Sequence, residues 1–388
     1  MSRPIVFGEP HFDETEEERV LAVLRSRWIG QGPVVEEFED QLGRYVGAHH
    51  SIAVSSCTAA LQLALMAAGI GPGDQVITTA FTFIATVNAI DSVGATPVLV
   101  DIDSETLNLD VGQVAEAVTS KTRAVVPVHF AGLAADLSAL DAVCAARDLF
   151  LVEDAAHAIG AVAEGKRIGS PRSDRNLVCF SFYPNKNLAS AEGGAVIAPT
   201  ADMAEDLRRR RLHGLDKDAW RRFAHVGQAV TLASEPGLKA NWTDLQAAIA
   251  LAQLEKLEGF LAVREHIADR YDELISDLDV GVSMRRRPRP GLDQRHALHL
   301  YQVRVSGGRR RRDALLTTMR AQGVGAAIHY LAIPEHPVFA GRWDRSFQHA
   351  ERAADELLSL PIHPGMSDSD VERVVECLES AARTHLSE

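Results

Sequence analysis

The sequence is poor in cysteine and contains no long apolar run. Its four cysteines, Cys57, Cys144, Cys179 and Cys377, form no CxxC pair and accompany no histidine cluster at metal-ligand spacing. We therefore expect reduced thiols and no metal site. No apolar stretch approaches the roughly 20 residues that span a bilayer, and the N-terminus soon turns acidic without the apolar segment of a secretory signal. The sequence predicts a cytoplasmic protein with no membrane role.

An excess of positive charge is also missing. The formal net charge of -13 opposes attraction to nucleic-acid phosphates and anionic lipids, so no nucleic-acid partner is expected. The one basic run, Arg285–Arg289 around Pro288, is consistent either with an anion site or with a solvated linker. At 388 residues the chain is long enough for two or three domains, or for one large domain with an appendage.

Short β-rich runs alternate with helix-like stretches from about residue 54 to residue 196. The runs are VITTA (76–80), PVLVD (97–101), AVVPVH (124–129), LFLVE (149–153), NLVCFSF (176–182) and AVIA (195–198). This rhythm is typical of an α/β fold with a mainly parallel sheet, in which ligands bind at the carboxyl ends of the strands. Polar or reactive residues follow two of these ends, so we expect the chemistry there.

The second half of the chain changes character. Residues 243–280 have apolar positions at helical spacing and predict a long helix or a bent helix pair, whereas the Arg-, Gly- and Pro-rich residues 281–297 predict an exposed connection. Beyond it, a strand (296–305), a helix closed by Gly323, a second strand (324–330) and a Ser-capped terminal helix predict a small α/β domain. We divide the chain into a large domain (1–243), a connecting helical region (244–280) and a small C-terminal domain (281–388).

The segment VEDAAHAIGA (152–161) delivers Asp154 from a β run into a string of small residues. A carboxylate in this place can face a ring nitrogen, as pyridoxal 5'-phosphate (PLP) requires, because an ionised acid keeps the pyridine nitrogen protonated. The alternative is an Asp that caps a following helix. The segment alone does not separate the two interpretations.

Lys186 follows the 176–182 run in a turn before a small, Gly-bearing stretch. Most single lysines are solvated surface cations, but a lysine between a buried strand and small residues can be desolvated and its amine activated as a nucleophile. Ser181, at the end of the same run, could donate its hydroxyl to a phosphate or cap a turn.

Small polar residues 55–58 (SSCT) open an apolar helix, and a helix N-terminus is an anion site that suits a phosphate. A simple Ser or Thr N-cap without a ligand is the alternative. Phe83, just past the 76–80 run, could stack on a pyridine ring or belong to the core.

These motifs together resemble the DegT/DnrJ/EryC1/StrS family of nucleotide-sugar aminotransferases. The resemblance runs in order from about Trp28 to the C-terminus and rests on SSCTAAL, FTFIATVNAI, PVHFAG, EDAAHAIGA, SFYPNKN with AEGG, TDLQAAIALAQLEKLE and IHY. It implies the aspartate aminotransferase fold (fold type I): a large domain with a mainly parallel seven-stranded sheet and a smaller C-terminal α/β domain. It also implies PLP as cofactor and a homodimer with shared active sites.

The resemblance implies a role for each matching residue. Lys186 matches the Schiff-base lysine, Asp154 the partner of the pyridine nitrogen, and His157 a position beside the phenolic oxygen of the cofactor. The matching phosphate and ring contacts are Ser56, Cys57, Thr58, Ser181 and the stacking residue Phe83. In GLKANWTD (237–244), Lys239 and Asn241 match positions that reach the cofactor of the neighbouring subunit. Substrate contacts are implied for Gln31, Tyr183, His213, His329 and Tyr330.

Three positions depart from the family pattern. Leu238 and Ala240 replace the usual aromatic residues, and Cys57 stands where Gly or Ala is common. His157, the Lys-x-Asn form of residues 239–241 and RLHGLD (211–216) are most similar to members that aminate C4 of a nucleotide-linked 4-keto sugar, such as the 4-amino-4-deoxyarabinose aminotransferase. We expect L-glutamate to give its amino group to PLP, and the keto sugar, linked to UDP or dTDP, to take it.

Three other functions are compatible with parts of this sequence. A C3-aminating or cyclitol aminotransferase of the same family more often carries Gln and an Asn-x-Arg form at the positions compared above. A PLP-dependent sugar dehydratase on the same scaffold carries His where this chain has Lys186. A non-catalytic PLP-binding regulator is opposed by the complete set of catalytic groups and by the lack of a basic recognition helix.

Overall fold

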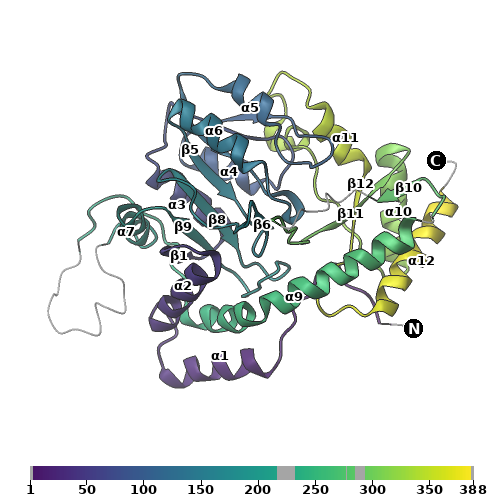
Figure 1. The fold of residues 1–388 in the computed structure, drawn as a ribbon, viewed down its shortest axis with the longest axis horizontal. Helices are drawn as coiled ribbons and strands as arrows, with labels where there is room; N and C mark the ends of the chain where they lie inside the picture. Colours follow the sequence, from purple (N-terminus) through teal and green to yellow (C-terminus); the bar gives the residue numbers. More distant parts are fainter. Residues whose placement is uncertain (1–2, 216–231, 277, 285–292, 386–388) are drawn as a thin grey trace.

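The computed structural model describes residues 3–215, 232–276, 278–284 and 293–385 (Figure 1). The basic run Arg285–Arg289 and the last residue of RLHGLD lie outside these ranges. The helices are α1 (Glu14–Ser26), α2 (Pro33–Val46), α3 (Cys57–Ala67), α4 (Ala85–Ser92), α5 (Val111–Ala117), α6 (Leu137–Arg147), α7 (Ala201–Arg210), α9 (Asp244–Ser276), α10 (Gly308–Ala321), α11 (Gln348–Glu356) and α12 (Asp368–Thr384).

The strands form one large and two small sheets. They are β1 (His50–Val54), β2 (Gln75–Thr79), β3 (Thr96–Val100), β4 (Thr122–Val126), β5 (Phe150–Asp154), β6 (Val162–Ala163), β7 (Lys166–Arg167), β8 (Asn176–Ser181), β9 (Gly194–Ala198), β10 (Val282–Met284), β11 (Tyr301–Val305) and β12 (Leu357–Leu360). The sheets have the orders β1-β9-β8-β5-β4-β2-β3, β10-β11-β12 and β6-β7.

The seven-stranded sheet is mainly parallel, and β9 runs antiparallel to β1 and β8. All six β runs expected between residues 76 and 198 are strands, so the predicted α/β class is confirmed. The strand β1 was not predicted, because its apolar run, Ile52–Val54, is only a few residues long. The strand forms because it pairs with β9, and this partner cannot be recognised from the short apolar run itself.

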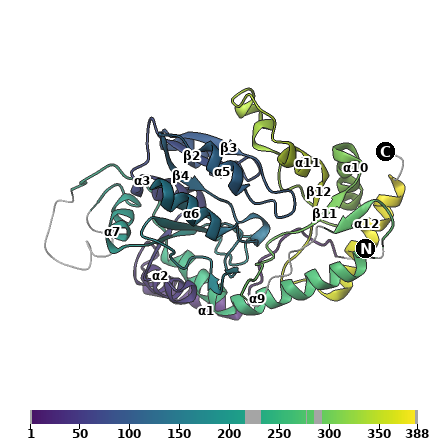
Figure 2. The same ribbon diagram turned by 45° about the horizontal axis from the view of Figure 1, so that its top comes forward.

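Helices cover both faces of this sheet (Figure 2). One core gathers Phe38 of α2, Leu140 of α6 and Leu251 of α9 against the strands, and the core on the other face gathers Leu63 of α3 and Leu207 of α7. Both faces of the sheet are therefore buried, as a parallel sheet requires. Polar side chains can therefore cluster beyond the ends of the strands.

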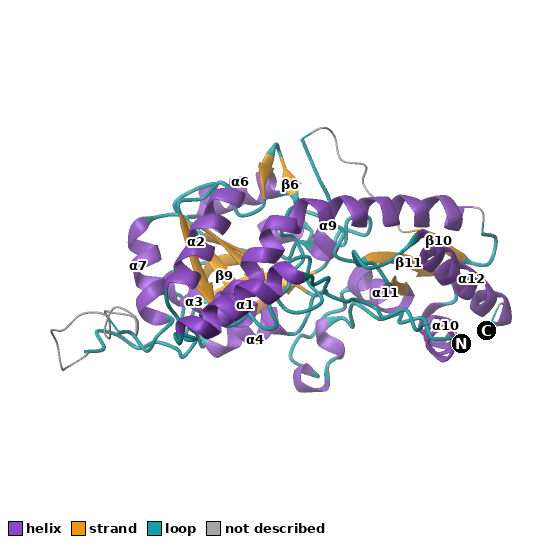
Figure 3. Ribbon diagram, turned by 90° about the horizontal axis from the view of Figure 1, so that it is seen from below, coloured by secondary structure: helices purple, strands orange, loops and turns teal. Residues whose placement is uncertain are grey.

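The long helix predicted after residue 243 is one continuous helix, α9, of 33 residues. It runs from α1 and α2 beside the large sheet to β10, β11 and α12 (Figure 3). Leu257 belongs to the core of the large sheet, and Tyr271 belongs to the C-terminal core. No helix in the described part of the chain combines the length and apolarity that crossing a bilayer requires.

Asp244, the first residue of α9, also closes the start of another helix. The N-cap of α2 is Gly32, which has no side chain to accept a hydrogen bond. The Asp244 carboxylate accepts hydrogen bonds from the N–H groups of Val34 (3.4 Å) and Val35 (3.1 Å) in its place. The two helices are thereby joined at their N-termini.

The C-terminal region departs from prediction in two places. Val282–Met284 forms β10, a strand within the expected connection, because it pairs with β11. The strand predicted at 324–330 does not form: Val324 pairs with Ile5 and Ala327 pairs with Ser359, so no continuous ladder develops. The terminal helix α12 has the predicted serine cap, Ser367. The predicted domain boundaries at residues 243 and 280 stay a prediction.

The strand predicted over 296–305 begins later, at Tyr301. Residues 297–299 hydrogen-bond instead to a loop of the large sheet, since Ala297 N–H donates to Gly132 (2.9 Å) and His299 N–H donates to Ala131 (3.0 Å). This segment therefore crosses from the C-terminal region to the strand ends of the large sheet.

Candidate active site

A cavity of about 430 Å³ opens at the carboxyl ends of β5 and β8 and the start of α3. Most of the predicted site residues line it, namely Ser56, Cys57, Thr58, Phe83, Asp154, His157, Ser181, Tyr183, Lys186, His329 and Tyr330. They come from segments far apart in the sequence. The position of the cavity agrees with the expectation that ligands bind beyond the ends of parallel strands.

The other four predicted residues do not line this cavity. Gln31 is buried, and its Oε1 atom has no hydrogen-bond partner. His213 and Lys239 are exposed side chains on neighbouring segments, because Leu212 and Lys239 form an isolated β-bridge. Lys239 donates a hydrogen bond to Asn241.

Asp154 is the last residue of β5, and its main-chain N–H donates to Pro127 across the sheet at 2.8 Å. Its carboxylate accepts hydrogen bonds from the Thr86 hydroxyl (2.8 Å) and from the N–H of Ala156 (3.2 Å). Residues 155–161 form turns and no helix, so the helix-cap interpretation of Asp154 is wrong. Burial raises the pKa of the Asp154 carboxyl group, and the two hydrogen bonds oppose that rise.

Lys186 lies in the turn after β8, where its N–H donates to the carbonyl of Tyr183 at 2.9 Å. Its side chain lines the cavity, so the alternative of a solvated surface cation is wrong. Desolvation lowers the pKa of the Lys186 amine to about 8, although the Cys57 thiol and the Asp154 carboxylate oppose this shift. About a tenth of the amine is therefore neutral at pH 7, far more than for an ordinary lysine, and the neutral form is the nucleophile.

The N-terminus of α3 faces the same cavity. Ser56 is the N-cap and accepts a hydrogen bond from the Ala59 N–H at 3.1 Å, so the cap is real. The first N–H groups of a helix have no acceptor within it and can bind an anion. Strand β9 passes very close here: a Cβ at Gly194 would lie 2.7 Å from the nitrogen of Cys57. A glycine is needed at this crossing.

The Cys57 thiol lies beside Asp154 and strand β8. Its Sγ atom lies 3.9 Å from Asp154 Oδ1 and 3.6 Å from the carbonyl oxygen of Cys179. Burial, reinforced by the nearby Asp154 carboxylate, raises the pKa of the Cys57 thiol well above its usual range. The thiol stays protonated, which leaves the backbone N–H as the group that Cys57 can offer to a phosphate.

Three histidines and a tyrosine lie close together at the cavity: His157, His329 and Tyr330 line it, and His299 packs against His157. His157 Nε2 lies 3.1 Å from the Tyr330 hydroxyl, and the His157 and His299 rings have centroids 4.3 Å apart. His329 Nδ1 lies 3.0 Å from the Ser359 hydroxyl. Burial lowers the pKa of His157 and of His299 well below the usual value, and that of His329 to about 3. All three imidazoles are neutral at neutral pH.

Two residues of this site, Thr86 and His299, were not predicted from the sequence. Thr86 holds the Asp154 carboxylate, and its hydroxyl also lies 3.1 Å from that of Thr82. His299 lies 3.4 Å from the Lys186 amine. Thr86 stands in a motif that drew attention only for Phe83. His299 stands in HALHLYQVRV, where a histidine directly before a β run was the available signal.

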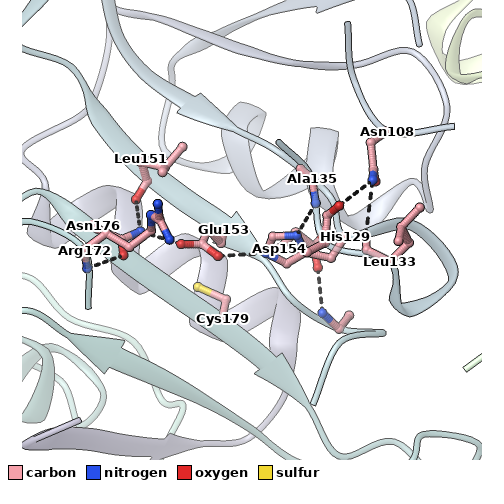
Figure 4. A network of polar contacts seen from close by, with 12 residues as sticks. Asn108, His129, Leu133, Ala135, Leu151, Glu153, Asp154, Arg172, Asn176 and Cys179 are labelled. Carbon is pink, nitrogen blue, oxygen red and sulfur yellow. Dashed lines mark hydrogen bonds and ion pairs between the residues drawn. The ribbon is translucent and has the colours of Figure 1, made fainter. Parts of the chain in front are cut away.

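A buried polar network lies beneath the Asp154 end of β5 (Figure 4). Glu153 accepts hydrogen bonds from Asn176 (2.7 Å) and from the His129 Nε2 atom (2.7 Å), and His129 Nδ1 accepts the Ala135 N–H at 3.0 Å. His129 N–H also donates to the Asp154 carbonyl at 3.1 Å. The network joins β5 and β8 to the 129–135 loop and fixes the backbone that presents Asp154.

These residues fit PLP as a bound group. The cavity holds a nucleophilic amine, a carboxylate for a ring nitrogen and a helix N-terminus for a phosphate. The buried atoms His157 Nδ1 and Asn185 Oδ1, which belong to two cavity-lining residues, have no hydrogen-bond partner, as expected where a polar ligand supplies one. The fold and the cavity define a PLP-dependent aminotransferase of fold type I.

The chain belongs to the DegT/DnrJ/EryC1/StrS aminotransferase family, whose model matches residues 10–379. It is 39% identical over 390 residues to the spore coat polysaccharide biosynthesis protein SpsC of Bacillus subtilis, with 97% of each chain covered. It is 29% identical to the sugar aminotransferase Spr1654 of Streptococcus pneumoniae, in its PMP form, with a TM-score of 0.90 and coverage of 98% of this chain and 99% of that one. TlmJ, an aminotransferase of Streptoalloteichus hindustanus, is 31% identical with a TM-score of 0.89 and the same coverage.

Spr1654 has also been solved in a PLP form. The cofactor of the present enzyme is PLP, and the enzyme is a sugar aminotransferase. The predicted family, fold class and cofactor are thereby confirmed.

Proposed function

We propose that this enzyme transfers the amino group of L-glutamate to C4 of a nucleotide-linked keto sugar, giving a nucleotide-linked amino-deoxysugar. The observation that carries the proposal is the presence of the Lys186 amine and the Asp154 carboxylate in one cavity, which neutral His157 also lines. PLP supplies an aldehyde that binds amines and a ring that withdraws electrons from the substrate carbon.

Lys186 is the residue that binds the cofactor covalently and later moves the proton. Desolvation brings its pKa to about 8, so the free amine can take a proton from carbon and return it in the second half-reaction. The protein must exclude water from this step. Neutral, buried His157 and His299 lie on one side of the amine and supply that shield.

Asp154 holds the proton of the pyridine nitrogen. The buried Asp154 carboxylate would form one half of an ion pair with a protonated ring nitrogen, and this pairing would offset the desolvation that raises the pKa of Asp154. Thr86 orients the carboxylate through its hydrogen bond to Oδ2.

The phosphate binds at the N-terminus of α3. Thr58 and Ser181 contribute hydroxyl groups, Ser56 and Cys57 contribute the backbone of the first turn, and the helix dipole favours the negative charge. Phe83, which is 57% exposed in the single chain and lines the cavity, would stack on the ring. Tyr183, His329 and Tyr330 line the remaining space, where the sugar binds.

The C4 position of amination rests on the residue pattern that resembles C4-aminating members: His157 and the Lys239-x-Asn241 form. The 39% identity to SpsC, a protein named for polysaccharide biosynthesis, agrees with a carbohydrate product. The acidic sequence without a long apolar run favours the cytoplasm as the place of the reaction.

The working unit is a homodimer in which each cavity is completed by the other chain. Lys239, Asn241 and His213 have no place in the cavity of their own chain, and Lys239 is exposed with its positive charge. Exposed apolar side chains of α1, Leu21 and Leu24, supply surface for a partner. Gln31, a few residues after α1 in the sequence and buried in the single chain, is the remaining residue proposed to contact the substrate.

Mixing two inactive variants tests the shared site. Lys186→Ala and Lys239→Ala form heterodimers in which one of the two sites keeps both residues, so activity returns after subunit exchange. The matched control mixes Lys186→Ala with itself. A fully active monomer in sedimentation, or no recovery despite demonstrated exchange, contradicts shared sites.

Activity on a panel of UDP- and dTDP-linked 3-keto and 4-keto sugars tests the function itself. With ¹⁵N-glutamate as donor, NMR of the product identifies the aminated carbon. Amination at C3 alone contradicts the C4 proposal but not the enzyme class. Bleaching of the yellow enzyme by glutamate without any sugar product turns attention to other keto acceptors.

A further inference from the structure

His299 contacts the amine that performs the chemistry, although it comes from a distant part of the chain. Its Nε2 atom lies 3.4 Å from Lys186 Nζ, at the long end of hydrogen-bond distances. The side chain is 4% exposed and packs against the His157 ring. Nothing in the local sequence of the lysine turn predicts this neighbour.

The segment that carries His299 is fastened directly to the lysine turn. Asn187, the residue after Lys186, donates its side-chain N–H to the Ala297 carbonyl at 2.7 Å. The segment therefore meets the turn twice, at Asn187 through the backbone and at Lys186 through the imidazole. A displacement of either side changes the distance between the imidazole and the amine.

Two further contacts hold the segment from behind. The buried Arg264 of α9 donates to the Leu298 carbonyl at 3.2 Å and to the Ile362 carbonyl at 2.8 Å. Leu298 has a φ of 50°, a left-handed conformation that non-glycine residues rarely adopt. The His299 N–H donates to Ala131 in the loop that His129 anchors. This backbone is costly to hold, and its effect is to place one imidazole beside one amine.

A comparison with His129 shows what is unusual about His299. Both nitrogens of His129 have partners, Glu153 and the Ala135 N–H, which fix its tautomer and explain its burial as structural (Figure 4). The His299 Nδ1 atom is buried without a partner. No second hydrogen bond therefore reserves the Nε2 atom for donation, and the neutral imidazole can accept an N–H from the amine.

We propose that His299 is a positioning residue for Lys186, accepting an N–H of the free amine so that its lone pair faces the cavity. The inference rests on the proposed role of Lys186. A lysine amine on four rotatable carbons has many orientations, and proton transfer needs one of them. Burial and the nearby Lys186 amine keep the pKa of His299 well below its usual value, so the imidazole orients the amine without competing for its proton.

The pair His299→Gln and His299→Met tests the proposal, because the two side chains have similar length and differ in the amide that can accept the hydrogen bond. The first measurement uses cofactor-free full-length protein and follows its covalent capture of added PLP by absorbance. We expect His299→Met to capture PLP about tenfold more slowly than the wild type and His299→Gln to recover much of that rate.

The second measurement separates orientation from packing. In turnover, His299→Met lowers kcat at least about tenfold with the KM for glutamate nearly unchanged, and the kinetic isotope effect with Cα-deuterated glutamate rises because proton transfer becomes slower. His299→Gln lies between the two in both quantities. A loss of packing alone reduces the active fraction and leaves the isotope effect as it is.

Two controls complete the experiment. His363→Phe changes another buried histidine, which is 4% exposed and directly follows Ile362, the residue whose carbonyl Arg264 also binds. This variant should leave the capture rate unchanged. Lys186→Ala should capture no PLP. If Lys186→Ala still captures PLP, the proposed role of Lys186 fails. If Lys186→Ala captures none but His299→Met matches the wild type, or if Gln and Met behave alike with an unchanged isotope effect, only the role of His299 is overturned. Should the Met variant fail to fold, His299→Asn, whose amide is too short to reach Lys186, takes its place.

Discussion

The two walls of the cavity are built in different ways. The sheet wall consists of Asp154 and Lys186 at the ends of β5 and β8, where parallel pairing sets Asp154 beside Cys179. The C-terminal wall consists of His329 and Tyr330, with His299 beside the Lys186 amine, and all three lie on segments without a strand. Regular ladders position the first wall. Single hydrogen bonds between distant residues position the second.

The contrast between the two walls indicates which residues couple chemistry to stability. The reactive groups of the sheet wall lie at or just after the ends of strands whose backbone hydrogen bonds do not depend on these side chains. Substituting these side chains should therefore affect chemistry more than folding. The C-terminal wall depends on groups such as Asn187 and Arg264, which serve both the fold and the site. The following changes test this contrast.

The largest effect is expected at Lys186. Lys186→Ala or Lys186→Arg removes the amine that binds the cofactor and moves the proton, so turnover should fall by a factor of about 10²–10⁴ or more. Circular dichroism and the melting temperature should stay close to those of the wild type, and PLP should still bind without the covalent absorbance band. Near-normal turnover of either variant would refute the assignment.

Asp154→Asn should come next. The amide keeps the hydrogen bond from Thr86 but carries no charge to hold the proton on the ring nitrogen, so kcat should fall at least about tenfold, roughly 1.4 kcal/mol in the barrier. The free energy of unfolding of the cofactor-free protein should not decrease, because the buried carboxylate that it loses is poorly solvated. A smaller fall in kcat would show that Asp154 acts mainly as a structural residue.

The pH dependence of PLP capture distinguishes titration of the Lys186 amine from titration of the nearby histidines. The groups that face Lys186 are the Cys57 thiol, the Asp154 carboxylate and the imidazoles of His157, His299 and His329. The imidazoles stay neutral above pH 6.5, and the amine has a pKa of about 8. Capture by cofactor-free protein should rise about tenfold from pH 7 toward a plateau above pH 8, since only the neutral amine reacts. A midpoint near or below 6.5 would contradict control of capture by the Lys186 amine.

Asn187→Ala should slow the chemistry least of these changes, but it should lower both the stability of the fold and the rate of PLP capture. It leaves the buried Ala297 carbonyl without its donor, so the free energy of unfolding should fall by about 1–3 kcal/mol. Capture of PLP should also slow by a few-fold, because the His299 segment loosens. Asn176→Ala, which removes a buried side-chain hydrogen bond from the network under β5, is the matched control and should destabilise without slowing capture as much. Equal slowing in both would remove the contrast between the walls.

Sequence analysis predicted the sheet wall because each of its residues carries a local signal. A β run ends at Asp154 and another ends before Lys186, and small residues follow both. The family resemblance implied His329 and Tyr330 of the C-terminal wall, but His299 and the local structure of this wall were not predicted, for a physical reason. Residues 324–330 divide their pairing between Ile5 and Ser359, and residues 297–299 bond to the 131–132 loop. Such partners are far away in the chain. His299 could therefore be recognised only once the segments were seen side by side.

Helix α9 also limits how this enzyme can be recombined with its relatives. It caps α2 through Asp244, contributes side chains to one core of the large sheet, donates to the Leu298 carbonyl through Arg264 and ends in the C-terminal core. A chimera that exchanged the C-terminal region at either end of this helix would pair a lysine turn from one parent with a histidine segment from another. Grafting for new sugar specificity should therefore exchange loops at the cavity mouth and inherit α9, residues 297–300 and residues 186–187 from one parent as a single block.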